Sequence, residues 1–259
     1  MSLRFMLAVA CWCLSVAALH AEDRERVFHR ALDTFDAARS PDEFRAAARL
    51  FEAVLDGGIE NGAVLYNLGN AHFRAGDYGR AIAAYRRALR LRPRDPYLRA
   101  NLQAALEAAP GGRAEADPPW WKRVFFWHAT LAQQERLFVA AGAWSLLFLL
   151  ALVRLWRAGG SERTAGALRG ALAFALLVAL LASVSAVLGD RDEYARPRGV
   201  VLAETPARKG NGESYEPAFD QPLKQGAEFE VLDRRGGWVH LRLPEAGEGW
   251  LPESSVVTY

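Results

Sequence analysis

The histidines are the side chains of this sequence best suited to acid–base chemistry or metal binding, since imidazole does both near neutral pH. Outside the first twenty residues they stand at His29, His72, His128 and His240. They are scattered, and the sequence has no paired metal-ligand motif, phosphate loop or nucleophile elbow. We therefore expect no catalysis, no cofactor and no metal. An enzyme built from scattered residues is the alternative that the sequence leaves open.

An internal repeat of 34 residues organises the first part of the chain, since Phe44 aligns with Tyr78 and Phe51 with Tyr85 at that offset. The second copy, residues 62–95, resembles the tetratricopeptide repeat. Its motif positions hold Leu65, Leu68, Gly69, Ala81, Tyr85, Ala88 and Pro93. Gly69 is small where two antiparallel helices touch, and Tyr85 fills the space between them.

The first copy, at about residues 28–61, matches the repeat well only in its second helix, and residues 96–109 predict one more helix that covers the end of the stack. We expect an all-α helical-repeat domain at residues 22–109. The resemblance implies a concave groove that receives peptides, at Tyr66, Asn67, Asn70, Arg74, Tyr97 and Asn101.

Within that groove, Asn67 and Asn101 are one period apart. Their amides are suited to hold a peptide backbone, and Arg74 is suited to bind a carboxylate. The alternative is that these side chains are solvated or make polar contacts within the helical stack.

The first apolar block predicts export. An uncharged stretch at residues 5–19 follows Arg4 and is short for a membrane span, which favours a signal peptide at residues 1–21. The open choices are cleavage after Ala18 or after Ala21, an uncleaved anchor, and lipidation at Cys11. Because Cys11 and Cys13 are the only cysteines, cleavage would leave a mature protein without thiols.

Two further uncharged runs, at residues 137–153 and 170–189, predict transmembrane helices, because each approaches the roughly 20 residues that cross about 30 Å of hydrocarbon. A pair of buried core helices is the alternative. We assign the spans to residues 137–156 and 170–189, after a linker at 110–119 and an amphipathic interfacial segment at 120–136 that contains Trp120, Trp121, Lys122, Arg123 and Trp127. Small residues line one face of the second span, at Ala171, Ala175, Ala179 and Ala182.

The charges of the connection between the spans predict topology. Residues 154–169 hold four arginines and one glutamate, so the positive-inside rule places the loop at 157–169 in the cytoplasm. Together with the signal peptide, this predicts a bacterial inner-membrane protein whose two soluble parts face the periplasm.

The residues after Arg196 change to short alternating runs separated by glycine and proline, which predicts a small all-β barrel at 197–259. The end of this segment resembles bacterial SH3-like domains, with Gly-Trp strands at Trp238 and Trp250 whose rings we expect to pack partly in the core. Tyr215 and Phe219 lie where such domains have the loop between their first two strands. These two rings, together with Trp238 and Trp250, are the candidate lining of a groove for a cell-wall peptide or a protein tail; the alternative is that they are core aromatics.

The order of these parts resembles the BatE-type proteins of bacterial aerotolerance operons. That resemblance implies partners that carry von Willebrand type A domains in the membrane and, indirectly, a MoxR-type ATPase. We expect a non-catalytic adaptor that binds proteins and contacts membrane lipid; a peptidoglycan-binding module is the alternative. The net charge of +2, from 32 basic and 30 acidic residues, argues against nucleic acid as a partner.

Overall fold

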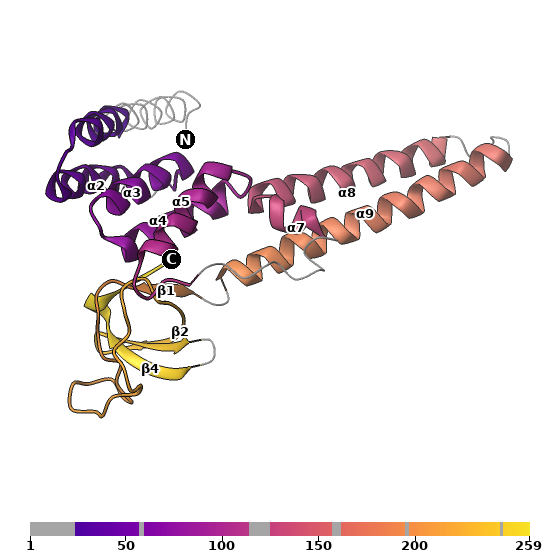
Figure 1. The fold of residues 1–259 in the computed structure, drawn as a ribbon. Coiled ribbons are helices and arrows are strands. Elements are labelled where there is room, and N and C mark those ends of the chain that lie inside the picture. The colour runs from indigo at the N-terminus through magenta and orange to yellow at the C-terminus, as the bar shows by residue number, and fades with distance from the viewer. Residues whose placement is uncertain (1–23, 57–59, 114–124, 157–161, 195–196, 244–245) are drawn as a thin grey trace, which may run out of the picture.

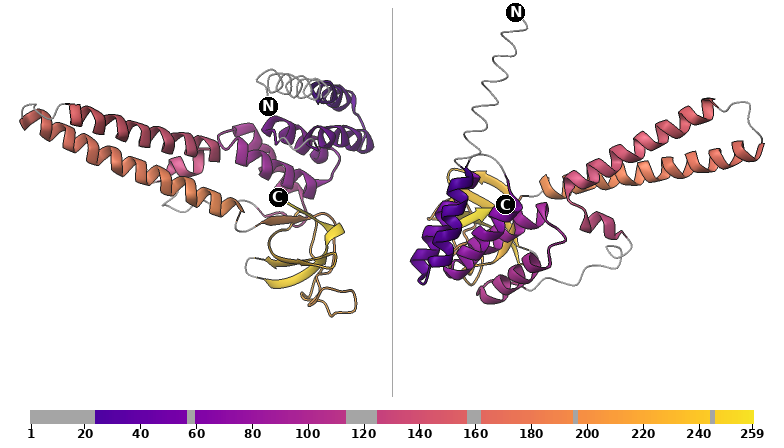
Figure 2. Two further views of the ribbon diagram at one scale, coloured as in Figure 1. Left: turned by 180° about the vertical axis from the view of Figure 1, so that it is seen from behind. Right: turned by 90° about the horizontal axis from the view of Figure 1, so that it is seen from above.

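A computed structural model describes the whole chain except residues 1–23, 57–59, 114–124, 157–161, 195–196 and 244–245 (Figure 1). The predicted signal peptide and residues 120–124 of the predicted interfacial segment therefore lie outside the described residues. The described chain forms a helical stack, a long two-helix hairpin and a small β-sheet. The hairpin projects away from the other two parts (Figures 1 and 2).

The stack contains a helix at residues 24–37, α2 (Pro41–Leu55), α3 (Gly62–Arg74), α4 (Tyr78–Leu91) and α5 (Pro96–Ala108). Side chains cap three of these helices, because the first N–H groups of a helix have no partners within it. Ser40 and Glu43 form a capping box before α2. The side chains of Asn61 and Asp95 each accept hydrogen bonds from two backbone N–H groups, at the starts of α3 and α5. The repeat copy predicted at residues 62–95 is the pair α3 and α4.

The contact between Gly69 and Tyr85 joins α3 to α4. A Cβ atom at position 69 would lie 2.4 Å from the Tyr85 ring, so only a glycine lets the ring approach the helix this closely. Tyr85 is fully buried, and Leu65 and Ile82 are fully buried in the same core. The small and aromatic positions of the repeat motif are therefore the packing contacts of the helix pair.

The two-helix hairpin consists of α8 (Gln133–Trp156) and α9 (Glu162–Tyr194), and the short α7 (Phe126–Thr130) precedes it. α8 includes the whole first predicted span, whereas α9 begins before the second one, so residues 162–169 of the predicted loop are helical. The most apolar 18-residue stretches of α8 and α9 have mean hydropathies of 2.1 and 2.6, and only 6% and 22% of these stretches are buried. Both helices are thus apolar but exposed, unlike the core helices of a soluble domain, which is consistent with a membrane protein.

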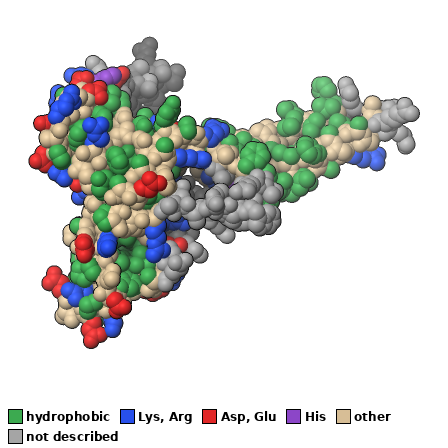
Figure 3. Space-filling view, in the orientation of Figure 1, with side chains coloured by type: hydrophobic (Ala, Val, Ile, Leu, Met, Phe, Trp, Pro, Cys, Tyr) green, Lys and Arg blue, Asp and Glu red, His purple; other side chains and the backbone are tan. Residues whose placement is uncertain are grey.

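The small-residue face of α9 packs within the hairpin. Ala175, Ala179 and Ala182 are buried where α9 runs beside α8. The Trp144 indole N–H donates a hydrogen bond to the Ser183 hydroxyl at 3.0 Å. This face is therefore used inside the chain, and large apolar side chains such as Phe148 point outward, which gives the hairpin its apolar surface in Figure 3.

The C-terminal part is one antiparallel sheet with the strand order β4-β3-β2-β1-β5. Its strands are β1 (Arg198–Val201), β2 (Glu228–Arg235), β3 (Trp238–Leu243), β4 (Gly247–Pro252) and β5 (Val256–Thr258). The predicted barrel is not closed, because no strand ladder among the described residues joins the edge strands β4 and β5. Instead, the loop at 202–227 bridges to β4 at a single pair, Arg208 and Trp250, and β5 has only three residues with which to pair.

The edge of the sheet formed by β1 and β5 packs against α4 (Figure 1). Val200 of β1 is fully buried within the core of the helical stack. A Cβ atom at Gly79 would lie 2.6 Å from the Val201 carbonyl oxygen, so this glycine permits the close approach of helix and strand. The stack and the sheet, which the hairpin separates in sequence, thus form one packed body.

An ion pair lies at the edge of this contact. Arg86 of α4 donates from Nε and Nη2 to the two carboxylate oxygens of Glu228 on β2, at 2.8 and 2.9 Å. The Tyr259 hydroxyl also donates to Glu228, at 2.5 Å. Burial raises the pKa of Glu228, but these hydrogen bonds outweigh burial and hold its pKa below the ordinary value of 4.5. Burial and the Glu228 charge raise the pKa of Tyr259, which keeps its hydroxyl a neutral donor.

We expect acidification to weaken the contact between stack and sheet. A carboxyl group whose folded-state pKa is lowered contributes its full stability above the ordinary value of 4.5 and loses it as the pH falls through the lowered pKa. Denaturant unfolding of the detergent-solubilised full chain should show this loss. Glu228→Gln, which cannot ionise, should unfold with a weaker pH dependence. Equal pH dependence in both proteins would assign the effect to other carboxylates.

Candidate functional site

A pocket of about 290 Å³, here called the repeat pocket, opens between the helix at residues 24–37, α3 and α5. Asn70 and Arg74 are four residues apart and therefore share one face of α3, and Asn101 of α5 lies across from them. The lining of the repeat pocket is Phe35, Asn70, Phe73, Arg74, Tyr85, Asn101 and Ala104. The lining thus combines three aromatic rings with two amide groups and one guanidinium.

Hydrogen bonds fix the orientation of the two amides. The Tyr85 hydroxyl and Asn101 Nδ2 both donate to Asn70 Oδ1, each at 2.8 Å. Asn101 Nδ2 also donates to the Tyr66 hydroxyl at 3.1 Å. Burial raises the pKa of Tyr85, so its hydroxyl remains a neutral donor to Asn70.

These bonds occupy only one atom of each amide. Within the described part of the chain, Asn70 Nδ2 and Asn101 Oδ1 have no hydrogen-bond partner. A donor and an acceptor therefore stand on neighbouring side chains at the pocket. A peptide group needs this pair, since its carbonyl oxygen accepts and its N–H donates.

Arg74 supplies a positive charge at the repeat pocket. Its guanidinium lies 4.7 Å from the centroid of the Phe44 ring, in a cation–π contact that restrains the side chain without neutralising its charge. No carboxylate of the described residues forms an ion pair with it. Arg74 is exposed and can therefore bind an acidic group of a ligand.

The structure brings only some of the predicted groove residues together. Asn70, Arg74 and Asn101 line the repeat pocket, and Tyr66 is joined to it through Asn101. Asn67 is half-buried and is not part of the lining. Tyr97 is 75% exposed and lines a separate cavity beside Glu135 of α8.

Sequence reasoning did not select the aromatic walls of the pocket, Phe35, Phe73 and Tyr85, or the small Ala104. One signal for Phe35 was available, because it stands where the repeat motif has a glycine. A large ring at that position of the first copy is too bulky for the close helix contact that a glycine allows, so it is expected at the surface of the helix. Tyr85 was correctly expected between the helices, but its hydroxyl also reaches the pocket through Asn70.

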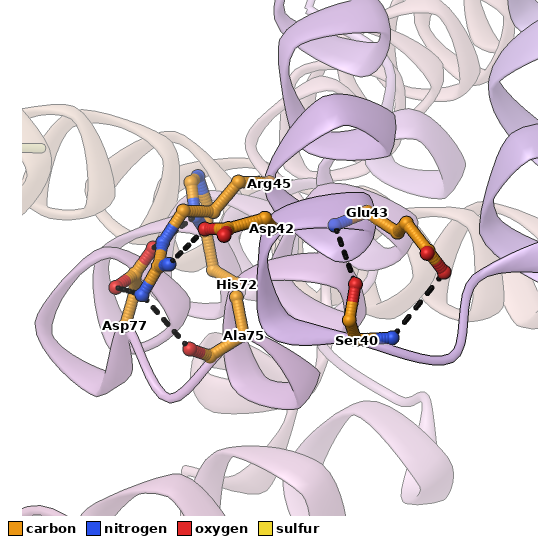
Figure 4. A network of polar contacts seen from close by, with 7 residues as sticks. All are labelled: Ser40, Asp42, Glu43, Arg45, His72, Ala75 and Asp77. Carbon is orange, nitrogen blue, oxygen red and sulfur yellow. Dashed lines mark hydrogen bonds and ion pairs between the residues drawn. The ribbon is translucent and has the colours of Figure 1, made fainter.

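A polar network holds the first helix pair against the second (Figure 4). Arg45 of α2 donates from Nε and Nη2 to the Asp77 carboxylate, at 3.0 and 3.2 Å, and from Nη2 to the Ala75 carbonyl oxygen. The buried His72 lies with Nε2 at 3.5 Å from Glu52, and this contact lowers the pKa of Glu52. The network connects α2 to the turn between α3 and α4. The contacts of His72 therefore stabilise the packing of these helices.

The other histidines outside the N-terminal block also have local partners. His128 Nδ1 is 3.0 Å from the Ser185 hydroxyl in the hairpin, His240 stacks on Trp250, and His29 lies 3.9 Å from Glu25. Among the residues that the structure describes, no three His, Cys, Asp or Glu side chains are arranged to hold a metal ion.

The structure does not assemble the predicted groove of the β-module. Trp238 and Trp250 are half-buried and alternate with the buried Val239 and Leu251, so their side chains point away from the sheet's core. The expectation that these rings contribute to the core is therefore wrong: the Trp250 ring stacks on His240, with centroids 4.6 Å apart, on the outward face.

The two loop aromatics lie elsewhere. Phe219 packs against the core of the sheet, near Gly249, and Tyr215 is 50% exposed, with its ring over Gly210. Among the described residues, no ring contact joins either of them to a tryptophan.

The helix pairs, their motif contacts and the pocket between first helices define a helical-repeat region in the first part of the chain. A family model described as tetratricopeptide repeat matches residues 62–95, the same residues that the sequence predicts and that fold as α3 and α4. No curated protein gives a significant match to the chain. Tetratricopeptide repeats mediate protein–protein interactions and are typically non-catalytic, so this part of the chain is a protein-interaction module.

Proposed function

We propose that this chain is a non-catalytic adaptor of a bacterial inner membrane that binds an acidic, extended segment of a protein partner in the repeat pocket. The observation that carries the proposal is the unpaired amide donor of Asn70 beside the unpaired acceptor of Asn101, within the described residues. Arg74, with no acidic partner there, supplies the charge preference. The partly exposed rings of Phe35 and Phe73 supply apolar contact with the side chains of the bound segment.

The contact between α4 and the sheet supports a topology in which both soluble parts face one side of the membrane. Two spans return the chain to the side from which it left, and α4 packs on β1 and β5. The arginine-rich connection then favours the cytoplasm for the loop and the periplasm for the packed body. We also propose that the sheet is an SH3-like module, since a long loop separates β1 from β2 and a hairpin joins the two Gly-Trp strands.

The order of modules supports a role in a BatE-type complex. Under this proposal the partner that enters the repeat pocket belongs to a membrane protein with a von Willebrand type A domain, and a MoxR-type ATPase acts on that complex. The second candidate function is binding of cell-wall peptide by the sheet. The half-exposed ring of Tyr215 favours it, because such a ring is available to a ligand.

Site-specific photocrosslinking in native membranes tests the adaptor proposal. A photoreactive amino acid at Ala104, which lines the repeat pocket, should capture a membrane protein, and Arg74→Ala should reduce that adduct several-fold while leaving the fold intact. The same probe at Arg49, an exposed position on α2, is the matched control. Equal adducts at both positions, or adducts that survive Arg74→Ala, would contradict the proposal. Capture of wall fragments by a probe at Tyr215 would support the second candidate.

A further inference from the structure

The segment at residues 91–97, which contains the turn between α4 and α5 and the first two residues of α5, lies at the base of the hairpin. Arg94 of this turn forms an ion pair with Glu135 in the first turn of α8. The uncharged run of α8 begins at Leu137, and a helix rises about 1.5 Å per residue, so the ion pair lies within roughly one helical turn of the apolar segment. If α8 crosses a membrane, this turn is level with the lipid headgroups.

Tyr97, the second residue of α5, presents an exposed aromatic side chain in this segment. Its ring is 75% exposed, although the backbone around it is fixed by the Asp95 cap, which accepts hydrogen bonds from the N–H groups of Tyr97 and Leu98. A rigidly presented aromatic ring with a polar tip is typical of the interface between membrane and water. This position explains why Tyr97 is exposed outside the repeat pocket.

The charges around Tyr97 fit a phosphate. The basic groups of this segment are Arg92 and Arg94 in the turn and Arg99 in α5. Two acidic groups pair with them, because Asp95 pairs with Arg92 and Glu135 pairs with Arg94. The balance of these groups is one positive charge, and among the residues that the structure describes Arg99 donates only to the Pro93 carbonyl oxygen. Figure 3 shows basic side chains where the stack meets the hairpin. A cavity of about 480 Å³ lies between the turn and Glu135.

We propose that residues 91–99 form a membrane-surface site that binds the phosphate of an anionic phospholipid headgroup. Arg94 and Arg99 contact the phosphate, and the Tyr97 ring lies among the headgroups. Since the Arg94–Glu135 pair also connects the turn to α8, lipid binding fixes the orientation of the helical stack relative to the bilayer. The site thereby determines in which direction the repeat pocket faces.

The proposal rests on the proposed placement of α8 in a membrane, and one experiment separates the two. The full chain, with Cys11 and Cys13 replaced by serine, is reconstituted into nanodiscs of phosphatidylcholine with phosphatidylglycerol. A nitroxide is attached in turn to Tyr97→Cys, Phe148→Cys and Arg49→Cys. All three positions are exposed, so the label should not disturb the fold. Collision rates with oxygen, which concentrates in lipid, and with an aqueous nickel complex report the depth of each label.

We expect the label at position 148 in the hydrocarbon, the label at 49 in water and the label at 97 at the headgroup level. Arg94→Gln with Arg99→Gln should raise the nickel collision rate at position 97 several-fold, and nanodiscs of phosphatidylcholine alone should give an intermediate rate. An aqueous label at 97 together with a label at 148 in the hydrocarbon would overturn the lipid site alone. A nickel collision rate at 97 that does not change with the arginine substitutions would do the same. An aqueous label at 148 would overturn the membrane placement and the site with it.

Discussion

Replacement of Tyr85 by alanine should destabilise the helical stack by about 3–5 kcal/mol, the usual cost of truncating a large buried aromatic side chain. Tyr85 has no exposed surface, and its ring lies against Gly69, which has no side chain of its own to extend into the space that the ring would leave. The substitution therefore leaves a cavity between α3 and α4, and it removes the hydroxyl that orients Asn70. Hydrogen exchange of the α3 and α4 amides, measured on the full chain in nanodiscs, reports this loss separately from the hairpin.

Tyr85→Phe is the matched control, because it keeps the ring and removes only the hydroxyl. It should cost about 1 kcal/mol, the net value of one hydrogen bond. It should also leave Asn70 Oδ1 with Asn101 as its one remaining donor, which loosens the orientation of the Asn70 amide and so weakens partner capture at the repeat pocket more than it weakens the stack. If the alanine and phenylalanine variants exchanged at the same rate, the ring would not be the main contact between the helices.

The repeat and the two apolar helices could be predicted because their signals are local in sequence. In α3 and α4, the residues that define the motif are the ones that touch, as Gly69 and Tyr85 show. In α8 and α9, length and hydropathy suffice. The contact between α4 and the sheet has no such signal. Arg86 and Glu228 are 142 residues apart, and nothing in the sequence near either one indicates the other.

The closed barrel was a prediction from strand pattern alone, and pattern does not determine closure. Alternation identifies β3 and β4 well, but closure depends on whether the two edge strands can pair. Here the long loop places Arg208 beside Trp250 of β4, and β5 is short and packs on α4. The edge that would close the barrel instead joins the sheet to the helical stack.

The repeat pocket shows the same limit on a smaller scale. The period of 34 residues makes Asn67 and Asn101 equivalent, which predicts that they act together on one peptide backbone. In the structure Asn101 bonds Asn70, which is 31 residues away. Equivalent residues of successive repeats lie on neighbouring helices, one helix spacing apart. The side chains that touch between those helices come from positions that are not equivalent, because each side chain leans along its own helix axis. Sequence can therefore identify the face, whereas the pairing within it needs coordinates.

The second large effect is expected from Arg86→Ala, which should weaken the contact between the helical stack and the sheet by about 1.5–3 kcal/mol, the value of hydrogen bonds to a charged group. The substitution removes two hydrogen bonds from the Glu228 carboxylate and leaves it with Tyr259 in a mostly buried position. Loss of one partner of such a pair costs more than loss of both, because the remaining charge stays desolvated. Faster hydrogen exchange in β1 and β5, with α8 and α9 unchanged, would be the readout.

A double-mutant cycle separates the ion pair from the packing around it. If Glu228→Gln in the Arg86→Ala background costs much less than it does alone, the two side chains act as a pair, and the coupling measures their contribution to the contact. Arg242→Ala provides the comparison, since Arg242 pairs with Glu248 on the exposed face of the same sheet and should cost less than about 1 kcal/mol. Additive costs for Arg86 and Glu228 would mean that Val200 and the close approach at Gly79 hold the stack and the sheet together without help from the charges.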